Sequence, residues 1–251
     1  MKICVRGKKI MNYTVQLPVK DGKIDLNFME SFVAQLEAER IAQLEAYLAI
    51  SGFDNYELSE EELNALQEYS NLEFYEFNVL DVFTVKNTSN LLLSDIVKNS
   101  GKTPYLCASS ENNSVSSYIE YDKKYLEKGN CIFIGGKTFV VSYQENDFFS
   151  NDSHNLALYL KNQNDQTKLN QLFIATCVSK SLSYKYSWGN SVSKTKIKCD
   201  KISLPVIDGK PNFEIMKTFI SAIQKLVIKD VVIYSDRKIA ATKEAISKLN
   251  N

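Results

Sequence analysis

The chain has 251 residues, enough for one large domain or two small ones to bury a hydrophobic core. Its 30 basic side chains equal its 30 acidic ones, so no overall positive charge indicates a nucleic-acid binder. The five cysteines are scattered without a CxxC pair and there is a single histidine, which argues against a zinc site and fits a reducing cytoplasm. The sequence has no run of eighteen apolar residues, so it predicts no membrane span.

A repeated segment lies near each end of the chain. QLPVKDGKIDLNFMESF at residues 16–32 returns as SLPVIDGKPNFEIMKTF at residues 203–219, an offset of 187. In each copy an extended Leu-Pro pair precedes an Asp-Gly turn, and Asp25 or Asn212 follows as a good helix N-cap. The sequence therefore predicts the same entry, strand then turn then helix, at both places.

An amphipathic helix follows each copy of the repeat. Apolar residues recur every three or four positions after Asp25, up to a closing Gly52, and again from about residue 213. Neither helix is apolar all round, so we expect the two to pair in a coiled-coil-like way, although two ordinary core helices would show the same pattern. The side chains expected at this partner or dimer interface are Met29, Phe32, Leu36, Leu44, Met216, Phe219, Ile223 and Leu226.

Between the helices the composition changes at about residue 77. Residues 53–76 contain no Lys or Arg, and Ser59 with Glu62 forms a capping box for a short helix, so this acidic connector should lie away from DNA phosphates. Further on, short β-rich runs alternate with polar loops, and LLLSDIVKN and TKLNQLFIATCVSKSL are typical of helices. The pattern predicts an α+β domain with a strand-dominated core.

The best candidates for contacts with DNA lie in three polar stretches of that domain. Residues 180–201 hold six lysines against Asp200 alone, with aromatic and hydroxyl side chains between them. Lysines bind phosphates, whereas Ser, Asn and aromatic groups contact bases. A solvated charged face, ordinary polar loops and a Trp188 packed in the core explain the same residues equally simply. The candidates are Ser109, Ser110, Asn112, Asn113, Lys137, Thr138, Tyr184, Tyr186, Trp188, Ser191, Lys194 and Lys196.

Signals for catalysis are weak. The GGKT segment at 135–138 lacks phosphate-loop spacing, and three cysteines (107, 131 and 177) lie inside apolar runs, which indicates packing. His154 has no nucleophile beside it in the sequence. Methyltransferase and nuclease motifs are also missing, so we expect a non-catalytic chain without a cofactor or a metal.

Three stretches together resemble a known family. They read GKTPYLCASSENNSVSSYI (101–119), GNCIFIGGKTFVVSYQENDFFSNDSHNLALYL (129–160) and KTKIKCDKISLPV (194–206). In order and spacing they resemble the target-recognition domain of type I restriction–modification specificity (S) subunits, and they are also similar to Bcg-like type IIB specificity subunits. The repeated LPVxDGK-helix units resemble the two conserved helical regions of those subunits.

The resemblance implies a strand-rich DNA target-recognition domain flanked by two long helices that pair as an antiparallel spacer. It also implies double-stranded DNA and a methyltransferase subunit as direct partners, and a restriction subunit as an indirect one. The expected organisation is a residual recognition-domain tail and turn at 1–24, a first spacer helix at 25–52, the acidic connector at 53–76, the recognition domain at 77–205 and a second spacer helix at 206–251.

This sequence departs from the family pattern by having one recognition domain between its two helices. We therefore expect a half-length subunit that forms a homodimer through the helices and binds a palindromic split site. Two alternatives remain open, namely a helical scaffold that binds no DNA and a truncated decoy that binds methyltransferase.

Overall fold

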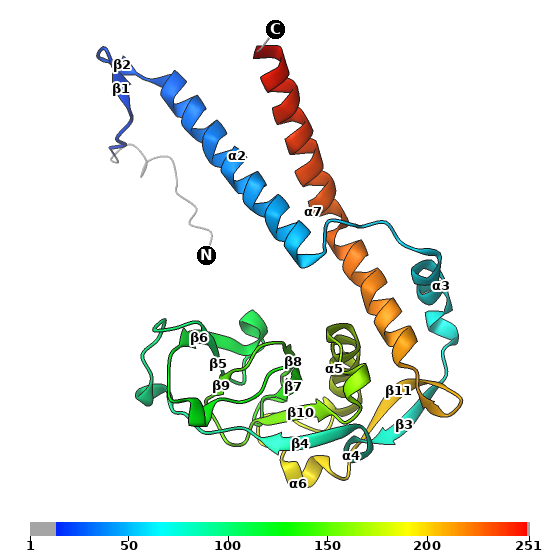
Figure 1. The fold of residues 1–251 in the computed structure, drawn as a ribbon. Helices are drawn as coiled ribbons and strands as arrows, with labels where there is room; N and C mark the ends of the chain where they lie inside the picture. The colour runs from blue at the N-terminus through cyan, green and yellow to red at the C-terminus, as the bar shows by residue number, and fades with distance from the viewer. Residues whose placement is uncertain (1–13, 250–251) are drawn as a thin grey trace, which may run out of the picture. The chain divides into compact units, whose positions relative to one another are not determined.

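The computed structural model describes residues 14–249 and has an α+β fold (Figure 1). Its contacts divide the chain into two compact units. The recognition unit is Glu57–Leu226, and the helical unit combines the described residues up to Tyr56 with those from Val227 onward. The long helix α7 (Phe213–Leu249) contributes to both units.

Both copies of the repeat form the same two-stranded hairpin. In the helical unit β1 (Val19–Lys20) pairs with β2 (Lys23–Ile24), and in the recognition unit β11 (Lys201–Ile207) pairs with β12 (Lys210–Pro211). The φ angles at the Asp-Gly turns are 51° and 77° in the first copy and 50° and 73° in the second. Positive φ at both positions is the geometry that Asp-Gly favours in a hairpin.

The predicted N-caps are also confirmed. Asp25 Oδ1 accepts a hydrogen bond of 2.9 Å from the Phe28 backbone N–H, at the start of α2 (Leu26–Ser51). Asn212 Oδ1 accepts one of 3.1 Å from the Ile215 N–H at the start of α7. Helix α2 ends, as predicted, at a left-handed Gly52. The predicted recognition-domain tail before residue 14 lies outside the described residues.

In the helical unit, α2 and the second part of α7 run antiparallel (Figure 1). Glu37 and Lys238 form an ion pair of 3.6 Å, and Leu48 and Val232 are buried. The first half of α2 behaves differently, because every residue from 30 to 40 is exposed. The helix pair therefore leaves apolar side chains of α2 uncovered.

Three sheets form the recognition unit. The largest is an antiparallel four-stranded sheet in the order β4 (Phe83–Asn87), β10 (Leu156–Leu160), β7 (Cys131–Ile134) and β8 (Val141–Gln144). A second has the order β12, β11, β3 (Phe74–Asn78), and a third the order β6 (Val115–Ile119), β5 (Thr103–Leu106), β9 (Phe149–Ser150). The helices of this unit are α3 (Glu60–Glu68), α4 (Val79–Val82), α5 (Lys168–Leu182), α6 (Lys194–Ile197) and the start of α7.

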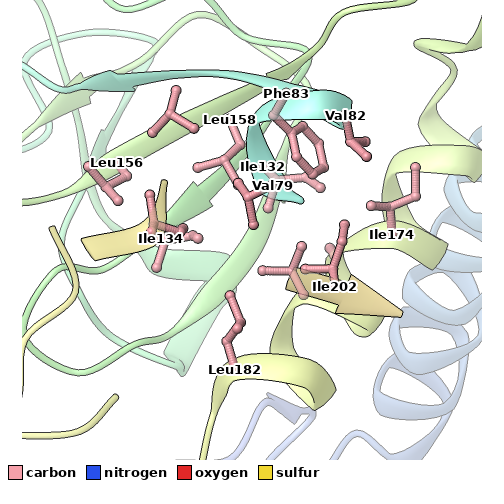
Figure 2. Close-up of a cluster of buried hydrophobic side chains, with 14 of the residues drawn as sticks. Val79, Val82, Phe83, Ile132, Ile134, Leu156, Leu158, Ile174, Leu182 and Ile202 are labelled. Atoms are coloured by element: carbon pink, nitrogen blue, oxygen red, sulfur yellow. The ribbon is translucent and has the colours of Figure 1, made fainter. Parts of the chain in front are cut away.

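The main core lies between the four-stranded sheet, α5 and β11. Helix α5 forms where the sequence predicts it, and it contributes Ile174 and Leu182. Strand β7 is buried at all four positions, as expected for a central strand with both faces covered. Figure 2 shows side chains from these elements and from α4 pointing toward one another: Val79, Val82, Phe83, Ile132, Ile134, Leu156, Leu158, Ile174, Leu182 and Ile202.

The structure differs from the sequence analysis around the first boundary. Helix α3 and strand β3 belong to the recognition unit, which begins at Glu57 rather than at residue 77. The capping box of Ser59 and Glu62 is confirmed, but the Glu62 carboxylate also accepts from Ser221 at 2.6 Å and from Lys225 at 2.8 Å on α7. These bonds are why the acidic segment is part of the domain. The helix predicted for residues 91–99 is wrong, since only a 3-10 turn forms at Leu93–Asp95.

The four α7 residues expected at a helix interface all lie in the recognition unit: Met216, Phe219, Ile223 and Leu226. Met216 is fully buried in the main core of the recognition unit. Phe219 stacks on Tyr69 with ring centroids 4.4 Å apart, and meets Phe173 edge-on at 5.9 Å. The part of α7 from Phe213 to Leu226 therefore belongs to the recognition unit, and only its later part belongs to the helical unit.

Candidate nucleic-acid interface

Four loops of the recognition unit converge, and together we call them the loop cluster: residues 107–114, 135–140, 151–155 and 187–192. The turn between β7 and β8 joins them. Thr138 Oγ1 donates to the Ala108 carbonyl at 3.0 Å, and the Gly136 N–H donates to Asn155 Oδ1 at 2.9 Å. The Val192 N–H donates to the Gly136 carbonyl at 3.0 Å. The structure thus brings together candidate residues that are up to about eighty positions apart in the sequence.

The close approach of these loops requires glycine in the turn. A Cβ on Gly135 would lie 2.6 Å from the Ala108 Cβ, and one on Gly136 would lie 2.6 Å from the His154 carbonyl carbon. Both distances are shorter than real Cβ contacts. A side chain at either position would push the loops apart, so the two glycines hold the loop cluster closed.

The loop at 107–114 has an unusual backbone. Asn112, Asn113 and Ser114 are consecutive residues with φ of 48°, 51° and 68°. Left-handed residues other than glycine persist only where their surroundings hold them. Here Asn113 Nδ2 donates to the Tyr143 carbonyl at 3.0 Å, and Ser114 Oγ donates to the Ser109 carbonyl at 3.1 Å. Both asparagine amide nitrogens thus fix the loop, since Asn112 Nδ2 donates to the Val115 carbonyl at 3.0 Å, while the side chains of Ser110 and Asn112 lie exposed.

Asp152 on the 151–155 loop contacts two side chains of the loop cluster. Asp152 accepts from Lys137 Nζ at 2.8 Å through Oδ2, and its Oδ1 lies 2.7 Å from His154 Nδ1. Partial burial raises the pKa of the Asp152 carboxyl, but the bonds from Lys137 and His154 outweigh it and lower that pKa to about 2. Asp152 was not among the sequence candidates, because a single Asp in a polar loop carries no pattern of its own.

The aromatic residues of the basic segment divide into two groups. Tyr184 and Trp188 are 85% and 79% exposed, so a core position for Trp188 is wrong. Tyr186 is 2% exposed, which rules out the predicted contact with DNA. Its ring packs on Phe139 at 5.2 Å and its hydroxyl donates to the buried Asp200 carboxylate, and burial together with this bond raises the pKa of Tyr186.

The lysines of this segment also differ. Lys194 is exposed at the start of α6. Lys196 Nζ donates to Asn190 Oδ1 at 2.9 Å and to the Ser191 carbonyl at 2.8 Å, so it fixes the loop that carries Trp188. Lys185 is paired with Asp200, which raises the pKa of the lysine.

Neither a metal cluster nor the thiol of Cys131 or Cys177 provides an alternative site among the described residues. Among them no group of three His, Cys, Asp or Glu side chains could hold a metal ion. Burial raises the pKa of the Cys131 thiol, and likewise that of Cys177, to about 12, so both stay protonated and act as packing residues. Within residues 14–249, no helix is long and apolar enough to cross a lipid bilayer.

Residues 71–232, which include the whole loop cluster, match the family model described as the type I restriction modification DNA specificity domain. The chain belongs to this family. The resemblance inferred from the sequence is thereby confirmed. A curated relative is the specificity subunit S.BcgI of a type II restriction enzyme from Heyndrickxia coagulans, which is 26% identical over 154 residues. The match covers 61% of this chain and 44% of S.BcgI, so it spans less than half of that protein.

Two solved structures are also similar. The S subunit of a type I restriction–modification system from M. genitalium is 13% identical, with a TM-score of 0.46, over 86% of this chain and 57% of that one. The HsdS subunit from Thermoanaerobacter tengcongensis is 13% identical, with a TM-score of 0.44, over 88% of this chain and 55% of that one.

Proposed function

We propose that the recognition unit binds a specific sequence in double-stranded DNA through the loop cluster and directs a methyltransferase subunit, and through it a restriction subunit, to that site. The role is non-catalytic. The observation that carries the proposal is the convergence of four loops on glycines 135 and 136, which gathers Ser110, Asn112 and Ser191 on neighbouring loops. Amide and hydroxyl groups of this kind contact base edges, and Lys194 on the adjoining helix suits a phosphate.

The apolar face of α2 supports a partner in the helical unit. Phe32 and Leu36 are 51% and 43% exposed, and the rings of Phe28 and Phe32 stack 6.0 Å apart. An exposed apolar stripe on a helix marks an interaction surface. We propose that this surface binds the methyltransferase subunit and that a second copy of the chain pairs through the same unit. A two-fold pair would bind a palindromic split site.

Co-expression with a methyltransferase subunit, followed by sequencing of modified bases, tests the proposal directly. A specificity subunit produces one modified motif, and that motif disappears when the chain is omitted. The opposite result, methyltransferase bound but no modified motif, identifies a decoy. A chain that assembles with neither methyltransferase nor DNA identifies a scaffold for other partners.

Removing a lysine near the loop cluster and another far from it provides a matched pair of variants for DNA binding. Lys194→Ala should weaken binding to all duplex sequences and reduce the salt slope by about one ion. Lys161 follows β10 at the end opposite to the loop cluster, about 17 Å away for a five-residue strand. Lys161→Ala should leave both quantities unchanged. Equal effects of the two substitutions would show that the DNA surface is misplaced.

The homodimer requires a separate measurement. Sedimentation velocity of the isolated chain should give a dimer, and Phe32→Asp should convert it to a monomer because a charge enters the apolar face of α2. A strict monomer, with one copy in each methyltransferase complex, would reject the homodimer and leave the DNA proposal intact.

A further inference from the structure

The turn that carries Trp188 is rigid although its indole is exposed. The Ser187 N–H donates to the Asn190 carbonyl at 3.3 Å, and the Asn190 N–H returns a bond of 3.0 Å to Ser187. Between them Gly189 has a φ of 99°, which only glycine adopts readily in such a two-residue turn. Trp188 therefore sits at the tip of a defined turn rather than in a loose loop.

Side-chain bonds hold the turn on both flanks. Asn190 Nδ2 donates to the Lys185 carbonyl at 2.7 Å, while Lys196 Nζ donates to Asn190 Oδ1. Behind the turn, the buried Tyr186 is anchored to Asp200. These contacts fix the backbone on either side of Trp188, so little conformational entropy is lost when the indole meets a ligand.

The surroundings of Trp188 indicate which ligand that is. Its neighbours in the turn are Ser187, Gly189 and Asn190, all polar or without a side chain, and the adjoining apolar residue Val192 is buried. A protein-binding Trp normally lies within an apolar patch. An exposed aromatic ring in a polar segment that also carries the exposed Lys194 instead suits a nucleic acid, because the ring stacks on a base while the lysine meets a phosphate.

We propose that Trp188 is a base-stacking residue that places its indole against a DNA base unstacked from its neighbour at the recognition site. This inference rests on the proposed function, since it needs DNA at the loop cluster. The Val192 backbone bond to Gly136 ties the turn to that cluster, so a duplex held by the other loops lies within reach of the turn. Asn190 is a positioning residue, which acts by holding the turn.

The chain contains a single tryptophan, so fluorescence excited at wavelengths that tyrosine does not absorb reports Trp188 alone. The probe is a duplex enriched from a random-sequence library by binding to the full-length chain. Binding should quench the fluorescence of Trp188 and protect it from acrylamide, since stacking on a base does both. A 2-aminopurine placed in turn at each position of the duplex should brighten at one step, where the base leaves its neighbour.

Substitutions give the second measurement. Trp188→Ala should weaken binding about 5- to 150-fold with an unchanged salt slope, which is the usual loss for one stacked base, whereas Trp188→Phe should retain most of the affinity. Asn190→Ala should give an intermediate loss and should lower the fluorescence anisotropy of Trp188 in the free chain. Tyr75→Ala is the matched control, because Tyr75 is an exposed ring on β3, outside the loop cluster. It should leave DNA affinity unchanged.

The outcomes separate this inference from the function on which it rests. Normal DNA binding with an unquenched Trp188 and an unaffected Trp188→Ala variant overturns the inference and leaves the proposed function standing. Loss of methyltransferase assembly with unchanged DNA affinity in Trp188→Ala would assign the ring to a protein contact and also overturn it. A chain that enriches no duplex from the library overturns both.

Discussion

Phe32 and Phe219 occupy equivalent positions of the repeat, 187 residues apart, but the structure places them in opposite environments. Phe219 lies between the rings of Tyr69 and Phe173 in the recognition unit. Truncating a packed Phe to Ala costs about 3–5 kcal/mol, and partial burial puts Phe219→Ala near 3 kcal/mol. For a unit of this size each kcal/mol lowers the Tm by about 2–4 °C, so we expect a loss of about 6–12 °C.

Phe32→Ala is the matched variant, because its side chain is half exposed on α2. A surface substitution changes stability by about 0.5 kcal/mol at most, so the melting of the chain, at a concentration low enough to keep it monomeric, should move by no more than about 2 °C. Thermal melts followed by far-UV circular dichroism compare the two variants directly. Equal shifts, or a Phe219→Ala shift below about 2 °C, would refute the assignment of the first turns of α7 to the recognition unit.

Three further predictions concern buried or paired carboxylates. The pKa of Asp152 lies below its ordinary value, so the stability that this carboxylate contributes is complete above about pH 4 and is lost as the pH falls toward 2. Asp152→Asn should lower the free energy of unfolding by about 1 kcal/mol in urea titrations at pH 7, and it should flatten the dependence of stability on acid pH. Glu62→Gln leaves Lys225 without its ion pair, so it should cost about 2 kcal/mol, and a cost near zero would mean that this link does not fasten α3 to α7. Asp200→Asn should cost about 2 kcal/mol and increase hydrogen exchange in the Trp188 turn, since it weakens the anchor of Tyr186; unchanged exchange would count against that anchor.

The family assignment follows from the order and spacing of motifs in the sequence. The local elements follow from the sequence because they depend on short-range chemistry. Asp-Gly favours positive φ wherever it occurs, so both turns form as predicted. Asp25 and Asn212 cap the helices behind them through bonds that span three residues. By the same reasoning the β-rich runs form strands. The segment LLLSDIVKN is not a helix, although Leu91 is buried and Ile96 packs against the same core cluster; only a 3-10 turn forms between them.

Tertiary structure alone decided which of two similar residues faces solvent. Tyr186 and Trp188 are two positions apart in a polar segment, and the inward one is set by Phe139 and Asp200, which no local pattern connects to it. Phe219 is likewise partly buried by rings from elsewhere in the chain, whereas Phe32, with a similar sequence around it, is half exposed. Burial depends on partners brought together by folding, and local sequence specifies only the conformation that presents each side chain to them.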